Sequence, residues 1–179
     1  MRIISGSARG RRLQTLAGND VRPTTDKVKE AIFSAIQFDT PGRRFLDLFA
    51  GSGQMGLEAL SRGAASAVFI DSSNESVKVL KENVTATGFS DVSKIYRADA
   101  LTFLSTTSET FDIAFLDPPY AGGLLENALL KVCDRMSAYG IIICEHPPEV
   151  TLPDNVGEFS VFKRYRYGKI NVTTYKKEA

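Results

Sequence analysis

The motif with the most chemical content in this sequence is Asp117-Pro118-Pro119-Tyr120, which directly follows an apolar run at residues 111–116. A residue before proline favours an extended backbone, so the Asp117 carboxylate should project from the end of a strand. The proline that follows has a fixed φ, which leaves the Pro118 carbonyl as a rigid acceptor. These two acceptors could hold both N–H groups of an exocyclic base amine while Tyr120 stacks on the base. The motif predicts that Asp117, Pro118 and Tyr120 catalyse methyl transfer to such an amine.

This chemistry requires no dedicated nucleophile in the protein. The lone pair of an exocyclic amine is delocalised into the ring, so orientation and polarisation of the amine must do most of the catalysis. The structural alternative for the motif is a rigid proline turn at a strand end, which would leave the pairing of an acid with an aromatic residue unexplained.

A glycine-rich turn lies upstream, between an expected strand at residues 44–49 and an expected helix at 54–62. Gly51, Gly53 and Gly56 match the pattern G-x-G-x-x-G, which lets a backbone approach a ligand at a helix N-terminus. The pattern alone suits either a pyrophosphate or a methionine carboxylate. Leu57 stands where a phosphate-binding loop needs lysine, which argues against that class of site.

Acidic residues follow three of the expected strands, at Asp47, Asp71 and Asp99. Parallel α/β sheets bind ligands at the carboxyl ends of their strands, and Asp71 stands where a carboxylate can accept hydrogen bonds from ribose hydroxyls. Acids around one crevice favour S-adenosylmethionine, which is a sulfonium cation without phosphates, over a dinucleotide. The structural alternatives are that Asp47 orients the glycine turn and that Asp99 caps a helix at 100–105. The expected cofactor contacts are Asp47, Ala50, Gly51, Gly53, Asp71, Asp99 and Ala100.

The elements that must position these residues alternate between strands and helices, which predicts an α/β fold with a mainly parallel sheet. The expected strands are 44–49, 66–70, 93–97, 111–116, 139–144, 158–166 and 169–176, and the expected helices of the core are 54–62, 74–87, 100–105 and 123–136. The last two strands are joined at Tyr167-Gly168 and read as an antiparallel hairpin. Such a seven-stranded, Rossmann-like sheet resembles the class I S-adenosylmethionine-dependent methyltransferase fold more than that of a dinucleotide dehydrogenase.

The first 43 residues are expected to form a short basic extension on a single domain of residues 1–179, with the catalytic core at 44–179. Residues 2–5 and 11–16 are expected to pair as a hairpin. A helix capped by Thr24 or Thr25 should follow and end near Pro41.

Charge is distributed unevenly although the net charge is only +1. The sums are +5 for residues 1–44, −9 for 45–159 and +5 for 160–179. Basic ends around an acidic middle suggest a polyanion bound by the termini, and the alternative is an ordinary solvated charged surface. The expected RNA contacts are Arg9, Arg11, Arg12, Arg22, Lys27 and Lys29.

The remaining polar residues suggest no further cofactor. Cys133 and Cys144 have no metal-ligand spacing and read as buried thiols without a disulfide, and no metal site is expected. His146 reads as a surface or loop residue. Because no apolar run approaches membrane-spanning length, we expect a cytoplasmic protein that does not enter a membrane.

Nearly the whole chain resembles the RsmD family, the bacterial guanine-N2 methyltransferases of small-subunit ribosomal RNA. The blocks that carry the resemblance are Met1 to Gly6, Ala8 to Leu13, Arg22 to Glu30, Leu46 to Gly63 and Asp117 to Tyr120. The Arg-Pro-Thr-Thr-Asp block is the discriminating one, because Asp-Pro-Pro-Tyr is shared with adenine-N6 methyltransferases.

The resemblance implies S-adenosylmethionine as cofactor, bound around Gly51, Gly53, Asp71 and Asp99. It also implies guanine of 16S ribosomal RNA in the small ribosomal subunit as substrate, held at Asp117, Pro118 and Tyr120. The sequence departs from the family where Lys27 and Lys29 replace frequent arginines and where Ser73 replaces a frequent acid. Lysine lacks arginine's bidentate fork, so phosphate contacts should be weaker there.

Three alternatives to this function remain open from the sequence. An adenine-N6 methyltransferase would use nearly the same chemistry at Asp117. A nicotinamide-dependent oxidoreductase could use the glycine turn and Asp71 but gives no role to the Asp117 motif. A noncatalytic RNA-binding module could retain the fold without the activity.

Overall fold

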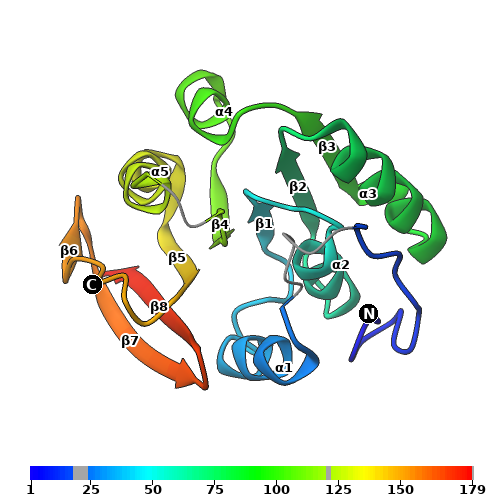
Figure 1. Ribbon diagram of the computed structural model, residues 1–179, viewed down its shortest axis with the longest axis horizontal. Coiled ribbons are helices and arrows are strands. Elements are labelled where there is room, and N and C mark those ends of the chain that lie inside the picture. The colour runs from blue at the N-terminus through cyan, green and yellow to red at the C-terminus, as the bar shows by residue number, and fades with distance from the viewer. Residues whose placement is uncertain (18–23, 120–121, 179) are drawn as a thin grey trace.

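The protein is a twisted eight-stranded sheet with helices on both faces (Figure 1). The computed structural model describes residues 1–17, 24–119 and 122–178. Strand order is β3-β2-β1-β4-β5-β8-β7-β6. The parallel strands are β1 (Arg44–Asp47), β2 (Ser66–Asp71), β3 (Ser93–Arg97), β4 (Phe111–Leu116) and β5 (Met136–His146). The antiparallel strands are β8 (Ile170–Lys177), β7 (Phe159–Tyr167) and β6 (Asn155–Val156).

The expected α/β fold with a mainly parallel sheet and a C-terminal antiparallel hairpin is confirmed, but the count of seven strands is wrong. The eighth strand, β6, has two residues and pairs with the start of β7 through a turn at Gly157, whose φ is +57°. Two residues are too few to show the alternation that identifies a strand in a sequence.

Helices α1, α2 and α3 cover one face of the sheet, and α4 and α5 cover the other (Figure 1). Their bounds are α1 Asp26–Ala35, α2 Gln54–Ser61, α3 Asn74–Thr87, α4 Ala100–Thr106 and α5 Leu124–Val132, with 3₁₀ turns at Ser90–Val92 and Cys133–Arg135. The expected helix at 123–136 is therefore shorter, because the chain tightens at Cys133 and β5 begins at Met136, which pairs with Phe111. The Thr25 side chain caps α1 by accepting from the Val28 N–H, as expected.

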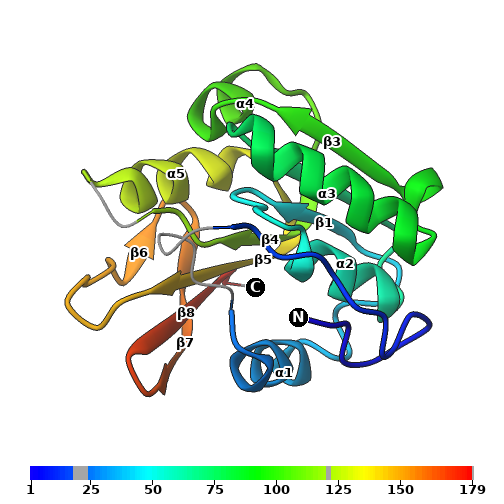
Figure 2. The ribbon, with the colours of Figure 1, turned by 45° about the vertical axis from the view of Figure 1, so that its right-hand side comes forward.

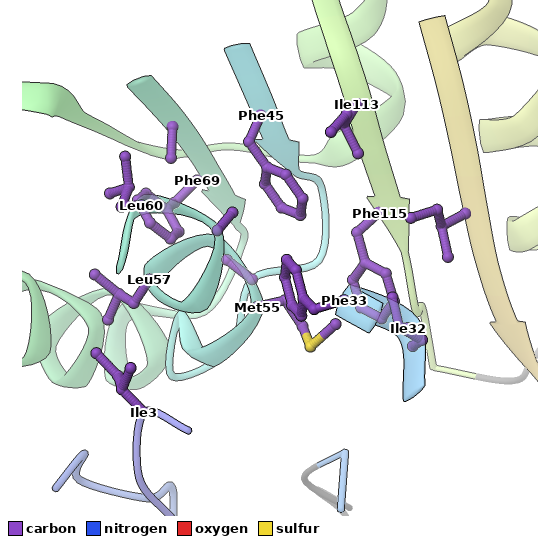
Figure 3. Packing of buried hydrophobic residues seen from close by; sticks show 14 of the residues in the cluster. Ile3, Ile32, Phe33, Phe45, Met55, Leu57, Leu60, Phe69, Ile113 and Phe115 are labelled. Atoms are coloured by element: carbon purple, nitrogen blue, oxygen red, sulfur yellow. The ribbon is translucent and has the colours of Figure 1, made fainter. Parts of the chain in front are cut away.

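Alternate residues of each strand build the two cores, since successive side chains point to opposite faces. Phe45, Phe69 and Phe115 lie in the core under α1, α2 and α3, whereas their neighbours Leu46 and Leu116 lie in the other. Figure 3 shows the strand phenylalanines packed against α2 and α1. Each fully buried side chain of this size contributes about 1.5–3 kcal/mol. This packing holds each strand, and therefore its carboxyl end, in place within the sheet.

The N-terminal segment forms the expected hairpin, though without regular strands. Arg2 and Arg12 make an isolated antiparallel bridge, and the Ile3 N–H donates to the Arg11 carbonyl at 2.9 Å. Ile3 and Leu13 are buried in the same core as α2. The hairpin therefore belongs to the folded body of the protein (Figure 2).

Within the described residues, no helix has the length and apolar character that crossing a bilayer requires. The same residues contain no group of three or more His, Cys, Asp or Glu that could hold a metal ion.

Candidate active site

The glycine turn after β1 is held by hydrogen bonds from two strand-end carboxylates. The Asp47 Oδ2 accepts from the Gly56 N–H at 3.0 Å, and the Asp71 Oδ2 accepts from the Gly51 N–H at 2.9 Å. The orienting role considered for Asp47 is thus confirmed, and Asp71 joins the same turn from β2. The two contacts fix the loop backbone between β1 and α2.

The glycines of this turn are required for two different reasons. Gly51 and Gly53 have φ values of +55° and +85°, in the left-handed region that disfavours other residues. A Cβ at Gly53 would also collide with the Leu80 side chain, and one at Gly56 would collide with the Phe69 ring. Among residues 1–17, 24–119 and 122–178, a Cβ at Gly51 would meet only the Leu16 side chain, at 3.8 Å. The backbone at Gly51 is therefore the part of the turn that a ligand can approach.

A single amide ties the glycine turn to the N-terminal segment. The Asn83 Nδ2 donates to the Ser52 carbonyl at 2.9 Å and to the Gln14 carbonyl at 3.0 Å, while its Oδ1 accepts from the Gln14 N–H at 2.8 Å. Asn83 is 1% exposed. The residues around Gln14 thus lie alongside the glycine turn, with α3 as the common support.

Asp71 keeps capacity for a ligand after its structural contacts are counted. Its Oδ1 accepts from the Ser73 N–H at 2.9 Å, so each carboxylate oxygen makes one described hydrogen bond. A carboxylate has about four lone-pair sites, which leaves acceptors for two adjacent hydroxyls. Asp71 is half-buried, so those acceptors can reach a ligand.

Asp99 acts as the N-cap of α4. Its Oδ2 accepts from the Thr102 N–H at 3.0 Å and from the Thr102 hydroxyl at 3.1 Å. The capping role considered for Asp99 is confirmed, and Ala100 begins the helix. The neighbouring Ala98 N–H donates to the Asp71 carbonyl at 3.1 Å, which keeps this helix start beside the end of β2. The first-turn N–H groups of a helix have no intrahelical acceptor and can donate to a ligand.

Asp117 has an acidic neighbour that the sequence analysis missed. Leu116 of β4 pairs with Cys144 of β5. The next residues of the two strands, Asp117 and Glu145, therefore lie side by side. Glu145 is 3% exposed, and the Thr24 hydroxyl, just before α1, donates to its Oε2 at 3.0 Å. The signal was present: Glu145 follows the apolar run of β5 as Asp117 follows that of β4.

Burial and neighbouring carboxylates raise the pKa values of Glu145 and Asp47 at this edge. Burial, reinforced by the charge of Asp117 and opposed by the Thr24 hydrogen bond, raises the pKa of Glu145 to about 8. Burial is also the main cause that raises the pKa of Asp47 to about 8, with further contributions from Asp71 and Asp117. A cation bound at this edge relieves the repulsion between these carboxyl groups, whereas a phosphate adds to it.

This arrangement predicts how stability depends on pH. A carboxyl whose pKa is about 8 in the folded protein and 4.5 when unfolded binds more protons when folded across that interval, so Glu145 lowers stability as pH rises through it. We expect Glu145→Gln, which keeps an acceptor for Thr24, to show a smaller loss of Tm between pH 5.5 and pH 8.5 than the wild-type protein. Thermal melts in matched buffers measure this, with the exposed Glu149→Gln as control. Parallel Tm curves for all three proteins would contradict the assignment.

Two of the residues expected to act here, Tyr120 and Arg22, lie outside the described residues. The other members expected at the site, Asp47, Ala50, Gly51, Gly53, Asp71, Asp99, Ala100, Asp117 and Pro118, all lie at or just beyond the carboxyl ends of β1 to β4. Pro118 is buried and Asp117 is half-buried.

Lys29 is not an RNA contact, contrary to expectation. Its side chain is fully buried, its Nζ lies 3.5 Å from the Glu58 Oε1, and it donates to the Arg2 carbonyl at 2.6 Å. Glu58 also accepts from the Ile4 N–H at 2.8 Å and from Arg62 Nε at 3.1 Å. Burial lowers the pKa of Lys29, while the charge of Glu58 opposes that shift. Lys29 therefore anchors the N-terminal hairpin to α2.

The other basic residues of the extension are exposed. Lys27 lies in the first turn of α1, three residues after the Thr24 that bonds Glu145, whereas the hairpin tip lies away from Asp117. Arg9, Arg11, Arg12 and Lys27 are exposed, and the Arg11 Nη1 donates to the Ala86 carbonyl at 2.8 Å. The tip of the hairpin contacts Ser61, where the Ala8 N–H donates to its Oγ at 2.9 Å. Ser61 ends α2, about 12 Å along the helix from the glycine turn at 1.5 Å per residue. The tip thus lies at the opposite edge of the sheet from the acidic cluster.

His146 is a core residue, so the expectation of a surface or loop position is wrong. It ends β5, is 3% exposed, and its Nε2 lies 2.8 Å from the Thr173 hydroxyl. Burial lowers its pKa. Cys144 is buried, Cys133 is half-buried, and both are free thiols.

Solved structures share this architecture. The Escherichia coli protein yhhF superposes with a TM-score of 0.89 at 34% identity, covering 100% of this chain and 98% of that one. A Thermus thermophilus 16S rRNA N2 G1207 methyltransferase (RsmC), solved with AdoMet and guanosine, superposes with a TM-score of 0.69 at 21% identity, covering 87% of this chain and 44% of that one. The second likeness shows a shared fold.

Related sequences extend over the full length. The Bacillus subtilis (strain 168) protein YlbH is 42% identical over 183 residues, covering 99% of each chain. The Escherichia coli (strain K12) protein named Ribosomal RNA small subunit methyltransferase D is 34% identical over 181 residues, covering 100% of this chain and 91% of that protein. A family model described as Conserved hypothetical protein 95 matches residues 1–176. The chain therefore belongs to the Conserved hypothetical protein 95 family, the RsmD family that its sequence resembles.

Proposed function

We propose that this protein is an S-adenosylmethionine-dependent methyltransferase that modifies the exocyclic N2 amine of a guanine in 16S ribosomal RNA of the small subunit. The observation that carries the proposal is that Asp117 stands at the same sheet edge as the glycine turn and the Asp71 carboxylate. The relative in Escherichia coli is named a small-subunit ribosomal RNA methyltransferase, and RsmC, of the same fold, is named for N2 of G1207.

The residues present fit S-adenosylmethionine. The edge gathers carboxylates from β1, β2, β4 and β5, and no lysine follows the glycine turn to receive a phosphate. We assign the ribose hydroxyls to Asp71, the amino-acid part to the backbone at Ala50, Gly51 and Gly53, and the remaining contacts to Asp47, Asp99 and Ala100. When bound, the cofactor supplies an electrophilic methyl group.

The protein's own groups then orient and polarise the base. The Asp117 carboxylate and the Pro118 carbonyl accept the two amine N–H groups, which directs the nitrogen lone pair along the line of transfer. Bound S-adenosylmethionine would supply the methyl group to the amine nitrogen and leave as the neutral thioether, and the Asp117 carboxylate would accept the proton that the amine loses. Tyr120 is assigned to stack on the base.

The rest of the chain is assigned to substrate binding. Residues 44–179 form the catalytic core and residues 1–43 an RNA-binding extension of the same domain. Arg9, Arg11, Arg12, Arg22 and Lys27 contact phosphates, which set the register of the RNA but not the base identity. This substrate places the protein in the cytoplasm with the ribosomes.

Methyl-labelled S-adenosylmethionine and small subunits from cells lacking this gene test the activity directly. Nucleoside digestion and mass spectrometry should find the label in N2-methylguanosine. Label in N6-methyladenosine would instead identify an adenine enzyme. Absence of label on subunits, naked RNA and DNA would refute the proposed activity.

The cofactor assignment predicts a loss of affinity in Asp71→Ala. The variant lacks the ribose acceptors and the hydrogen bond to the Gly51 N–H, and hydrogen bonds to charged groups contribute about 1.5–3 kcal/mol each. We expect the Kd for S-adenosylmethionine to rise at least about tenfold in titration calorimetry. The exposed Glu75→Ala in the first turn of α3 is the control and should bind as the wild-type protein does. An unchanged Kd for Asp71→Ala would remove Asp71 from the site.

A further inference from the structure

The turn of the C-terminal hairpin lies at the same edge of the sheet as the acidic cluster. β8 runs antiparallel to β5, and its register pairs His146 with Asn171. Tyr167 pairs with Ile170, so the turn at residues 168–169 projects just beyond the end of β5, where Glu145 and Asp117 lie. Both ribbon views show β7 and β8 as the outer part of the sheet next to α1 (Figures 1 and 2).

One face of this hairpin carries basic and aromatic side chains together. We call Phe162, Lys163, Tyr165, Tyr167, Lys169 and Lys176 the hairpin strip. Tyr165 and Tyr167 pack against the core that contains α1 and Ile143. Glu145 follows Ile143 by two residues in the same strand, so its side chain points to that face as well. The strip therefore begins on the catalytic face of the sheet.

Within the described part of the chain, the lysines of the strip have no acidic partner. Arg164 pairs with Asp154 at 2.7 Å, and Lys177 pairs with Glu158 at 3.2 Å. Among the described residues, no carboxylate oxygen lies within 4 Å of Lys163, Lys169 or Lys176. Their charges are therefore available to an external anion.

The aromatic rings are arranged as stacking surfaces. Phe162 is 53% exposed at a bulge in β7, with the Lys176 Nζ 4.0 Å and the Lys163 Nζ 5.6 Å from its ring centroid. Tyr165 and Tyr167 stack with their centroids 6.0 Å apart and an interplanar angle of 14°. Phe162 belongs to neither hydrophobic core and lies beside two ammonium groups. Unpaired bases stack on exposed rings of this kind while lysines bind the adjacent phosphates.

We propose that the hairpin strip binds the single-stranded RNA that flanks the target nucleotide, which deepens and rests on the function proposed above. Tyr167 and Lys169 bring the strip to the edge where the chemistry occurs, and Phe162, Lys163 and Lys176 continue it along the hairpin, with Lys176 level with Ile141 of β5. Arg11 and the tip of the N-terminal hairpin lie toward the opposite edge, beside Ala86 and Ser61. RNA bound by the strip enters the acidic cluster with its base extruded, and its phosphates stay on the lysines.

The test compares two triple variants with equal loss of charge. Lys163→Ala/Lys169→Ala/Lys176→Ala removes the strip lysines, and Lys78→Ala/Lys81→Ala/Lys131→Ala removes exposed lysines of α3 and α5. We expect the first to raise KM for small subunits at least about tenfold with kcat within about twofold, because phosphate contacts act on binding. Fluorescence anisotropy with a labelled 16-nucleotide single-stranded RNA gives Kd at several salt concentrations. For the strip triple, the slope of log Kd against log salt concentration should fall by about 2, because each lost phosphate contact lowers it by about 0.7. The control triple should keep the wild-type values.

Phe162→Ala tests the stacking part without a change in charge. We expect about tenfold weaker binding of the same RNA, an unchanged salt slope and unchanged S-adenosylmethionine affinity. An unchanged affinity in this variant would overturn the stacking role.

The remaining outcomes separate the strip from the proposed function. Equal losses in both triples would trace the effect to net charge and overturn the proposal, as would wild-type RNA binding by the strip triple. If the strip triple lost binding to small subunits but kept binding to naked RNA, the strip would contact a ribosomal protein, and the proposal that it binds RNA would be overturned. If the wild-type protein methylates no substrate and the strip triple still binds RNA more weakly than the wild type, the proposed activity is refuted and the RNA-binding role of the strip is supported.

Discussion

Asp117→Asn is expected to lower kcat for methyl transfer by about 10²–10³-fold, the usual effect of removing one electrostatic group at a reacting centre. Asparagine keeps one acceptor for an amine N–H but has no negative charge, so it neither polarises the amine as strongly nor accepts its proton. The Kd for S-adenosylmethionine should stay within about threefold of wild type, because Asp71 and the glycine turn are unchanged. Single-turnover labelling of small subunits and calorimetry measure the two quantities.

The matched control for this variant is Asp91→Asn, which neutralises an exposed aspartate in the 3₁₀ turn before β3. It should methylate at the wild-type rate. Equal rates for Asp117→Asn and the wild-type protein would show that methyl transfer does not depend on this carboxylate.

The second large effect is on stability. Glu58→Ala removes the acceptor of the Ile4 and Ser5 N–H groups and the partner of Lys29 and Arg62. Because Lys29 is then buried without its counter-charge, we expect the free energy of unfolding to fall by about 3–5 kcal/mol. Urea unfolding followed by circular dichroism measures the loss. Limited proteolysis should also cut the variant faster at Arg9, because the hairpin loses the Ile4 and Ser5 contacts to α2 and keeps those to Ser61.

Glu30→Ala is the control, since Glu30 pairs with the same Arg62 at 2.7 Å but its side chain is 49% exposed. Exposed ion pairs contribute about 0–1 kcal/mol, so this variant should unfold close to wild type. A similar loss in both variants would show that burial of Glu58 is not the source of its effect.

The sequence predicted the features that depend on local pattern. The alternation of apolar runs and turn residues gave the order of strands and helices, and the carboxyl ends of parallel strands meet at one edge, so the acids after them had to gather there. Thr25 capped its helix and the glycine turn followed β1 as expected. These features need only the neighbouring residues in the chain.

The features that the sequence did not predict depend on distant contacts. Lys29 reads as a surface cation because its partner, Glu58, lies on another helix that the fold brings alongside. His146 is buried because β8 returns next to β5 and covers it with Thr173. In the sequence, the hairpin strip showed only as the net positive charge of residues 160–179. The pairing of β7 with β8 decides which of its lysines lie near a carboxylate among the described residues.

The amide of Asn83 has a consequence for cooperativity between ligands. One side chain bonds both the N-terminal segment at Gln14 and the glycine turn at Ser52. A ligand that shifts either segment therefore acts, through this amide, on the other. Thermodynamic linkage makes such a coupling reciprocal: by whatever factor RNA on the N-terminal hairpin changes the affinity for the cofactor, the cofactor changes the affinity for that RNA by the same factor.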